Sequence, residues 1–169
     1  LIAIMLVSLR SLSDLNAGNN WGIPTELNFF ENYFEVFVRS PMATYFLNSL
    51  IITIPTTIIT LIISSMSGFT LAIHKFKFNM FIFAMFIAGN FIPFQILLVP
   101  VRSITIQFGM YDTWYALIIF HVAFQSGFCT FFLRNFIKEL PFELIEAARV
   151  DGATEIYIYT KIIIPLIRP

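Results

Sequence analysis

The sequence predicts an all-α protein that lies in a membrane. Hydrophobic residues make up 58% of the 169 residues and charged residues only 12%, whereas soluble domains carry about a quarter charged residues. Three long segments also contain no Asp, Glu, Lys or Arg. Apolar residues run through these segments without alternating with polar ones, which favours membrane-spanning helices over the strands of a membrane barrel.

The three uncharged segments are predicted to span the membrane at residues 44–73, 78–101 and 113–133. Each reaches the ~20 residues that a helix needs to cross ~30 Å of hydrocarbon. The first is longer than necessary, so we expect it to tilt, to kink near Pro55 or to protrude. In the second, Pro93 and Pro100 favour a kink or an early end.

Each end of the chain is an apolar run, and each run is too short to span a bilayer. Residues 1–9 are interpreted as the end of a first helix, and residues 161–169 as the start of another span. A secretory signal peptide is disfavoured, because no basic region precedes residues 1–9 and no small-residue cleavage site is evident. The chain is therefore expected to be a fragment with about three complete spans and two partial ones.

Basic residues orient the predicted spans. Six fall on one side of the membrane: Lys75, Lys77, Arg134, Lys138, Arg149 and Lys161. Three fall on the other side: Arg10, Arg39 and Arg102. Because cytoplasmic loops carry the excess of Lys and Arg, residues 139–160 are expected in the cytoplasm and residues 10–43 outside. Within the outer segment, NFFENYFEVFVRSP forms either a short amphipathic helix at the interface or a plain loop on the membrane.

The cytoplasmic segment 139–160 predicts a helix, a glycine turn and a second helix. Pro141 suits a first helical turn, where its missing N–H has no cost, and Asp151–Gly152 supplies a stop. The second helix would start near Ala153 or Thr154. Leu144, Ala147 and Ala148 share one side of the first helix, and Glu146 can pair with Arg149 three residues on. Such a segment is either a docking knob for a soluble partner or an ordinary connector.

The stretch EAARVDGATEIYIYTKIIIP resembles the EAA loop of ABC importer permeases. Its matching positions are Glu146–Ala147–Ala148, Gly152, Ile162 and Ile164–Pro165, and Ile164 stands where the pattern usually has Leu. ENYFEVFVRSPMATYFLNSL, FTLAIHKFKF, FIPFQILLVP and FFLRNFIKELPFELIEAARVDGA are similar to the maltose-type, sugar-importing branch. The resemblance covers nearly the whole chain from about Glu31.

This resemblance implies a multi-pass subunit of the bacterial inner membrane, with the helix bundle of a type I ABC importer. It also implies three protein partners: a second permease, a dimer of ATP-binding subunits and an extracytoplasmic sugar-binding protein. In the family the EAA segment inserts into the ATPase, so Glu146, Ala147, Ala148 and Gly152 would couple to it, with Arg149 and Asp151 alongside. ATP and Mg²⁺ would bind the partner, because this chain has no GxxxxGK[ST] motif.

Four polar residues inside the predicted spans are candidates for a substrate path: Asn90, Gln95, His121 and Gln125. Polar side chains in lipid must find partners, so they face either a water-filled path or another helix. His121 and Gln125 are four residues apart and share a helix face. They would either bind sugar hydroxyls or join helices by hydrogen bonds.

Several other functions lack support in the sequence. We find no catalytic motif and no metal-ligand spacing, and we interpret His74, beside Lys75 and Lys77, as part of a basic cluster that meets anionic lipid. Zero net charge gives no field that would favour nucleic acid. An ion-coupled secondary transporter is the alternative class, but the complete spans lack its usual acidic or basic residue. A polyol or glycerol-phosphate is the alternative cargo.

Overall fold

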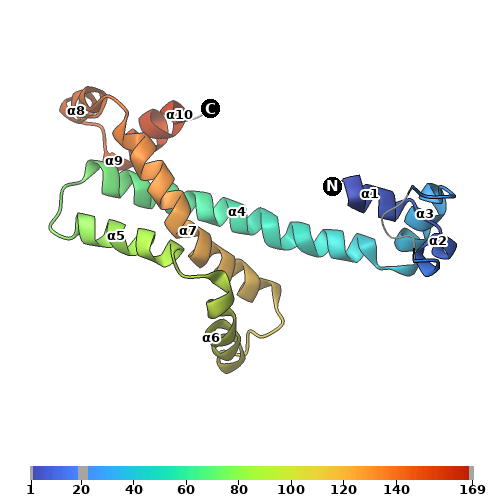
Figure 1. Ribbon diagram of the computed structural model, residues 1–169. Helices are drawn as coiled ribbons and strands as arrows, with labels where there is room; N and C mark the ends of the chain where they lie inside the picture. The colour runs from blue at the N-terminus through green and yellow to red at the C-terminus, as the bar shows by residue number, and fades with distance from the viewer. Residues whose placement is uncertain (1, 19–22, 168–169) are drawn as a thin grey trace. The chain divides into compact units, whose positions relative to one another are not determined.

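The computed structural model describes residues 2–18 and 23–167, and helices account for nearly all regular structure among them (Figure 1). The exception is an isolated antiparallel β-bridge between Arg10 and Leu27. The chain divides into two compact units, residues 1–50 and residues 51–169. The helices are α1 Ile2–Ser8, α2 Leu12–Asn16, α3 Phe29–Arg39, α4 Met42–Ile73, α5 Asn79–Asn90, α6 Phe94–Gln107, α7 Trp114–Lys138, α8 Phe142–Val150, α9 Glu155–Tyr157, the π-helix η1 Ile158–Ile163 and α10 Ile164–Leu166.

The N-terminal unit holds its short helices together with polar contacts. The carboxylate of Asp14 in α2 accepts hydrogen bonds from the Thr25 backbone N–H at 2.9 Å and from the Thr25 hydroxyl at 2.6 Å. Asn32 of α3 donates its side-chain amide to the carbonyl of Ser8 at 3.0 Å and to that of Arg10 at 2.8 Å. The segment expected outside the membrane is thus folded, with α2 and α3 inside it.

Of the two alternatives left open for NFFENYFEVFVRSP, the structure has the helix, α3, and the plain loop is wrong. Phe30, Phe34 and Phe37 recur at helical spacing and are all exposed. The more polar side carries an ion pair of 2.8 Å between Glu35 and Arg39, four residues apart.

Two helices among the described residues are long and apolar enough to cross a membrane, α4 with 32 residues and α7 with 25. At a rise of 1.5 Å per residue, α4 is about 48 Å long, well beyond the ~30 Å of hydrocarbon. Pro55 lies inside α4, which continues through it without a break. Both helices extend past their predicted bounds, 44–73 and 113–133.

The segment 78–101, predicted to span the membrane with a kink or an early end at Pro93 or Pro100, is broken at Pro93. The segment forms α5 and α6, which are bent by 99° at the intervening residues 91–93. Pro93 explains the break, because it lacks an N–H donor and restricts the residue before it to extended backbone. Pro100 lies inside α6 without ending it, and α6 runs on to Gln107. Helix α5 alone is about 18 Å long, too short to cross a bilayer.

Helices α5 and α7 pack against each other in the C-terminal unit (Figure 1). Gly127 permits their close approach, since a Cβ atom placed there would lie 2.7 Å from the backbone oxygen of Phe86. Small residues at such crossings allow helix backbones to meet in membranes. Further along the same contact, the rings of Phe83 and Phe131 stack with centroids 6.0 Å apart.

A buried arginine ties α7 to both neighbouring helices. Arg134 lies just beyond the predicted span, yet it is inside α7 and only 7% exposed. Its Nε donates to the carbonyl of Leu71 in α4 at 3.3 Å, and its guanidinium carbon lies 3.6 Å from the ring centroid of Phe83 in α5. The guanidinium plane can stack on the ring and donate to the carbonyl at once, which an ammonium group would do poorly.

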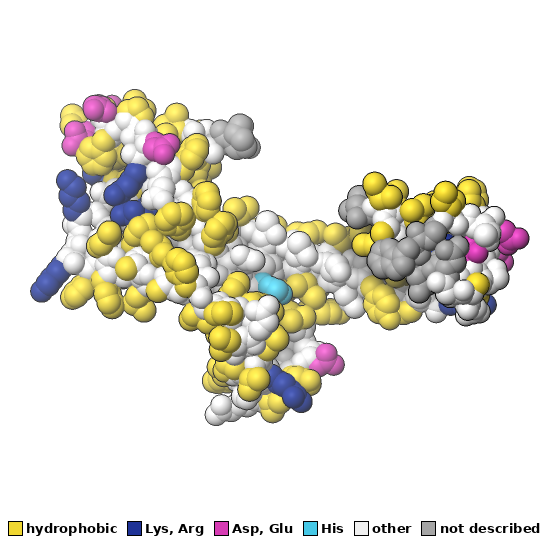
Figure 2. All heavy atoms as spheres, viewed as in Figure 1, with side chains coloured by type: hydrophobic (Ala, Val, Ile, Leu, Met, Phe, Trp, Pro, Cys, Tyr) yellow, Lys and Arg dark blue, Asp and Glu magenta, His cyan; other side chains and the backbone are white. Residues whose placement is uncertain are grey.

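The apolar core of the C-terminal unit lies where α4 and α7 meet the last helices. Its buried members are Phe69, Ile73, Ile137, Ile145, Ile158 and Ile163. Figure 2 shows charged side chains gathered at the α8 end of this unit and again around α6, with hydrophobic side chains between them. This banding of charge around an apolar belt is typical of a bundle that crosses a membrane.

Candidate functional site

The segment 139–160 forms the predicted helix, turn and second helix. Helix α8 starts one residue after Pro141, and Gly152 follows its end with φ of 80°, the left-handed conformation that glycine favours. The backbone N–H of Ala153 donates to the carbonyl of Ala148 at 2.9 Å, which satisfies a free carbonyl of the last turn. Thr154 then caps α9, its hydroxyl accepting from the Tyr157 N–H at 3.3 Å.

The two helices bury one side of this element and leave the other open. Ile145 of α8 is 2% exposed and Ile158 of η1 is fully buried, both within the core formed with α4 and α7. Ala148 is half-buried against the same core. Ala147 is exposed, as are the larger apolar side chains of Leu144 and Val150. The free side of α8 therefore combines these apolar side chains with the exposed side chains of Glu143 and Glu146.

Glu155 forms the electrostatic centre of the element. Its carboxylate accepts from Arg149 at 2.9 Å and lies 3.3 Å from the Nε2 atom of His74, which follows the end of α4. The expected pairing of Arg149 with Glu146 is therefore wrong, because the glycine turn folds α9 back and brings Glu155 to Arg149. His74 was interpreted from sequence only as part of a basic cluster at the lipid surface, and its contact with Glu155 was not foreseen.

A third connection joins η1 to α4. The hydroxyl groups of Ser65 and Tyr159 lie 2.6 Å apart, and the rings of Phe69 and Tyr159 have centroids 5.4 Å apart. The apolar core, the Glu155 contacts and this hydroxyl pair thus fasten the element to the ends of α4 and α7. Beside the turn lies a groove of about 570 Å³, lined by Ala148, Asp151, Gly152, Ala153, Thr154, Tyr157, Lys161 and Ile162.

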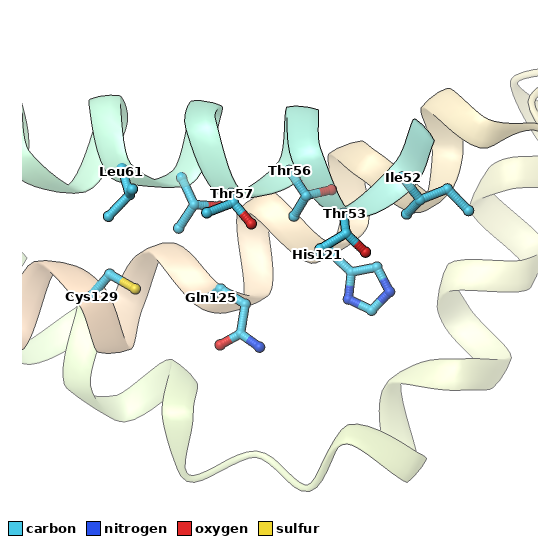
Figure 3. Close-up of a pocket in the computed structure, with 9 residues that line it drawn as sticks. Ile52, Thr53, Thr56, Thr57, Leu61, His121, Gln125 and Cys129 are labelled. Atoms are coloured by element: carbon cyan, nitrogen blue, oxygen red, sulfur yellow. The ribbon is translucent and has the colours of Figure 1, made fainter. Parts of the chain in front are cut away.

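A cavity of about 370 Å³ lies between α4 and α7 (Figure 3). It is lined by Ile52, Thr53, Thr56, Thr57, Thr60, Leu61, His121, Gln125 and Cys129. The structure therefore brings two of the predicted path residues, His121 and Gln125, to one cavity. The four threonines were not predicted, although their spacing of three, one and three residues places them on one face of a helix.

The other two predicted path residues lie elsewhere. Asn90 ends α5, where its side-chain amide donates to the Phe86 carbonyl at 2.9 Å, and it lines a separate cavity of about 310 Å³ with Phe124 and Gly127. Gln95 is exposed on α6 and lines neither cavity. In residues 2–18 and 23–167, no three His, Cys, Asp or Glu side chains are grouped so that they could hold a metal ion.

The described residues of the C-terminal unit thus form apolar helices, two of which are long and apolar enough to cross a membrane, with a partly charged helix–turn–helix at one end. Residues 39–169 match the family described as the inner membrane component of binding-protein-dependent transport systems. This match covers most of the chain, so the protein belongs to that family. Its helices are those of an all-α type I ABC importer transmembrane bundle.

Characterised relatives carry the same similarity over almost the entire chain. The osmoprotective compounds uptake permease protein GgtD of Synechocystis is 34% identical and covers 99% of this chain. The arabinooligosaccharides transport system permease protein AraQ of Bacillus subtilis is 31% identical and covers 100% of it. The melibiose/raffinose/stachyose import permease protein MelC of the same organism is 30% identical over 98%. The chain spans 58% of GgtD, 60% of AraQ and 59% of MelC.

Proposed function

We propose that this protein is the membrane-spanning subunit of an ATP-driven importer in a bacterial inner membrane, and that its substrate is a carbohydrate. Membership of the family supports the transport role. The substrate class rests on relatives named for arabinooligosaccharides, diacetylchitobiose and the melibiose group. A second permease, an ATP-binding dimer and an extracytoplasmic binding protein complete the assembly.

We further propose that residues 139–160 dock into a separate ATPase subunit. The observation that carries this proposal is the burial of only one side of α8. Ile145 lies in the core, while Ala147 and Val150 are exposed. A surface of small and apolar side chains lets another backbone approach closely. Arg149, Asp151 and Glu146 at its edges supply directional polar contacts.

Site-directed crosslinking of the assembled transporter tests the docking. Ala147→Cys and Val150→Cys should both form crosslinks to the ATPase with a short bifunctional reagent. Ala72→Cys is the matched control, because Ala72 is a half-buried alanine of α4 that packs against the same core from the other side. Absence of any ATPase adduct at Ala147 and Val150 contradicts the proposal. So does labelling of these positions from outside intact cells.

For the substrate path, we propose that His121 and Gln125 face the transported solute, whereas Asn90 serves helix packing beside Gly127. The cavity that His121 and Gln125 share supports their role in transport. The close approach of α5 and α7 at Gly127 supports the packing role of Asn90. His121→Ala and Gln125→Ala should therefore change uptake with little loss of assembly. Asn90→Ala should reduce recovery of the folded protein. The reverse pattern, in which Gln125→Ala loses assembly and Asn90→Ala alters only uptake, contradicts these assignments.

A further inference from the structure

The threonines of α4 form a polar stripe that the known motifs do not account for. Thr53, Thr56, Thr57 and Thr60 all line the cavity that also holds His121 and Gln125 (Figure 3). The rest of this stretch of α4 is occupied by isoleucine, leucine and proline. Ile58, on the opposite face, is 53% exposed. This part of α4 therefore has one face lined by threonine hydroxyls and an apolar face opposite it.

Two of these hydroxyl groups have no partner among the described residues. The Oγ1 atoms of Thr56 and Thr60 are buried and unpaired, and the Thr60 residue is only 5% exposed. Hydroxyl groups within apolar helices ordinarily donate to a carbonyl one turn back. This chain follows that rule at Ser49, which donates to Tyr45 at 3.0 Å, and at Ser103, which donates to Val99 at 3.2 Å. Buried hydroxyls without partners are unfavourable. The Thr130 hydroxyl is also buried and unpaired, but Thr56 and Thr60 differ from it because they line a cavity in which an occupant can bind them.

The polar groups of the cavity define what that occupant is. Hydroxyl, amide and imidazole groups can each donate and accept hydrogen bonds, whereas no Asp, Glu, Lys or Arg of residues 2–18 and 23–167 lines the cavity. A charged solute would lose its hydration there without a counter-charge, which is costly in an apolar bundle. The volume of about 370 Å³ lies within the usual range of small-molecule sites, roughly 300–1,000 Å³.

We propose that the threonine face of α4 is a wall of the translocation path, where Thr56, Thr57 and Thr60 act with His121 and Gln125 to pass an uncharged, hydroxyl-rich solute. This inference rests on the proposed transport function and adds α4 as a determinant of specificity. The threonine face would accept neutral sugars and polyols. It would disfavour phosphorylated or carboxylated solutes.

Cys129 provides a direct test, because it is the one cysteine of this sequence and lines the same cavity. The whole permease, assembled with its partners in membrane vesicles, is treated with two membrane-impermeant methanethiosulfonates, one cationic and one anionic. Mass spectrometry follows modification of the peptide that contains Cys129, and each rate is normalised to that of a free thiol. The cysteine thiolate, which forms where water reaches the sulfur, attacks the sulfenyl sulfur of the reagent, displaces methanesulfinate and forms a mixed disulfide.

The control is Cys129→Ser combined with Ile58→Cys, which moves the thiol to the apolar face of the partner helix. We expect Cys129 to react at least about tenfold faster than that thiol, with the two reagents within about threefold of each other. Thr56→Val together with Thr60→Val should slow modification at least about fivefold by removing the hydroxyls that hold water. Thr130→Val should not, because Thr130 is a fully buried threonine with an unpaired hydroxyl that does not line the cavity.

Equal rates at Cys129 and at the Ile58→Cys thiol overturn the inference, as does an unchanged rate in the double valine variant. A preference for one charge well beyond threefold overturns the part that concerns uncharged solutes. The same preparation is probed for the ATPase subunit. Its absence counts against the proposed function. An unreactive Cys129 in a complex that retains the ATPase counts against this inference alone.

Discussion

The Nε2 atom of His74 lies 3.3 Å from the Oε2 atom of Glu155, and this contact joins the end of α4 to the start of α9. The other carboxylate oxygen of Glu155 accepts from Arg149 of α8 at 2.9 Å. The Glu155 side chain thus connects the end of α4, helix α8 and helix α9. A force applied to α8 would reach α4 through this carboxylate as well as through the apolar core.

Glu155→Gln should loosen α8 without unfolding the protein. The partners of Glu155 are between a third and a half exposed. The stability of the packed element should therefore fall by about 0.5–1 kcal/mol, which is typical of solvent-screened pairs. Hydrogen exchange at the amides of α8 and α9 measures it, and faster exchange is expected there. Glu146→Gln, which removes the same charge from an exposed position of α8, is the control. Unaltered exchange in Glu155→Gln means that the contacts of Glu155 with Arg149 and His74 do not hold the element.

Gly152→Val should destabilise the turn through its backbone. No atom lies within 4 Å of a Cβ placed at Gly152, so steric contact is not the cause. The φ of 80° is unfavourable for side chains, and strongly so for β-branched ones, with a cost of about 1–2 kcal/mol or more. The temperature of thermal unfolding and the amount of ATPase recovered in pull-downs should both decrease. Gly152→Asn should retain most of both, because Asn tolerates this conformation, and equal loss in the two variants contradicts the backbone explanation.

Gly127→Ala should push α5 and α7 apart. The new Cβ would lie 2.7 Å from the Phe86 carbonyl oxygen and 3.0 Å from the Asn90 side chain, and the resulting overpacking should cost about 1–3 kcal/mol. Gly89→Ala is a matched control in α5, since its Cβ would meet nothing within 4 Å and alanine favours the helix by about 0.5–1 kcal/mol. The melting temperature in detergent should fall in the first variant only. Equal melting temperatures disprove the close-packing role of Gly127.

Asp14 should give the N-terminal unit a defined acid sensitivity. Hydrogen bonds from the Thr25 hydroxyl and backbone N–H hold the pKa of Asp14 below its ordinary value. Because the folded-state pKa is depressed, its stabilisation is complete above the ordinary value of about 3.9 and is lost as pH falls through the folded-state pKa. Thr25→Val should raise the pKa of Asp14, measured by NMR titration of the carboxyl carbon. An unchanged titration midpoint of Asp14 in Thr25→Val contradicts the role of the hydroxyl. Thr44→Val, at a threonine far along the sequence, serves as the control.

The helix–turn–helix of residues 139–160 was the most predictable part of the fold, because its signals are local. A proline before α8, a glycine after it and a threonine before α9 each act within one helical turn, so their spacing alone predicts the element. Helix α3 was predictable for the same reason, from its repeating phenylalanines. The bend between α5 and α6 was half predicted: Pro93 indicated an end, but an uninterrupted apolar composition suggested that one helix crossed the membrane.

The contacts between distant segments could not be predicted in this way. Glu155 and His74 are far apart in the sequence, and nothing local distinguishes Glu155 from Glu146 as the partner of Arg149. The threonine stripe was visible in the spacing of α4, yet its meaning depends on which side of α7 it faces. Arg134 illustrates the same point, because its charge suggested the end of a span, whereas Leu71 and Phe83 provide a buried site for it.

Composition and helical spacing alone determined that this chain is a membrane-embedded helical protein with a helix–turn–helix at its charged end. These properties arise from the cost of burying charge in lipid and from backbone preferences that act over a few residues. Only the tertiary structure decided that His74 meets Glu155 and Ser65 meets Tyr159, and that the α4 threonines line one cavity with His121 and Gln125. Such pairings depend on how helices cross, and crossing is set by side-chain shape over the whole interface.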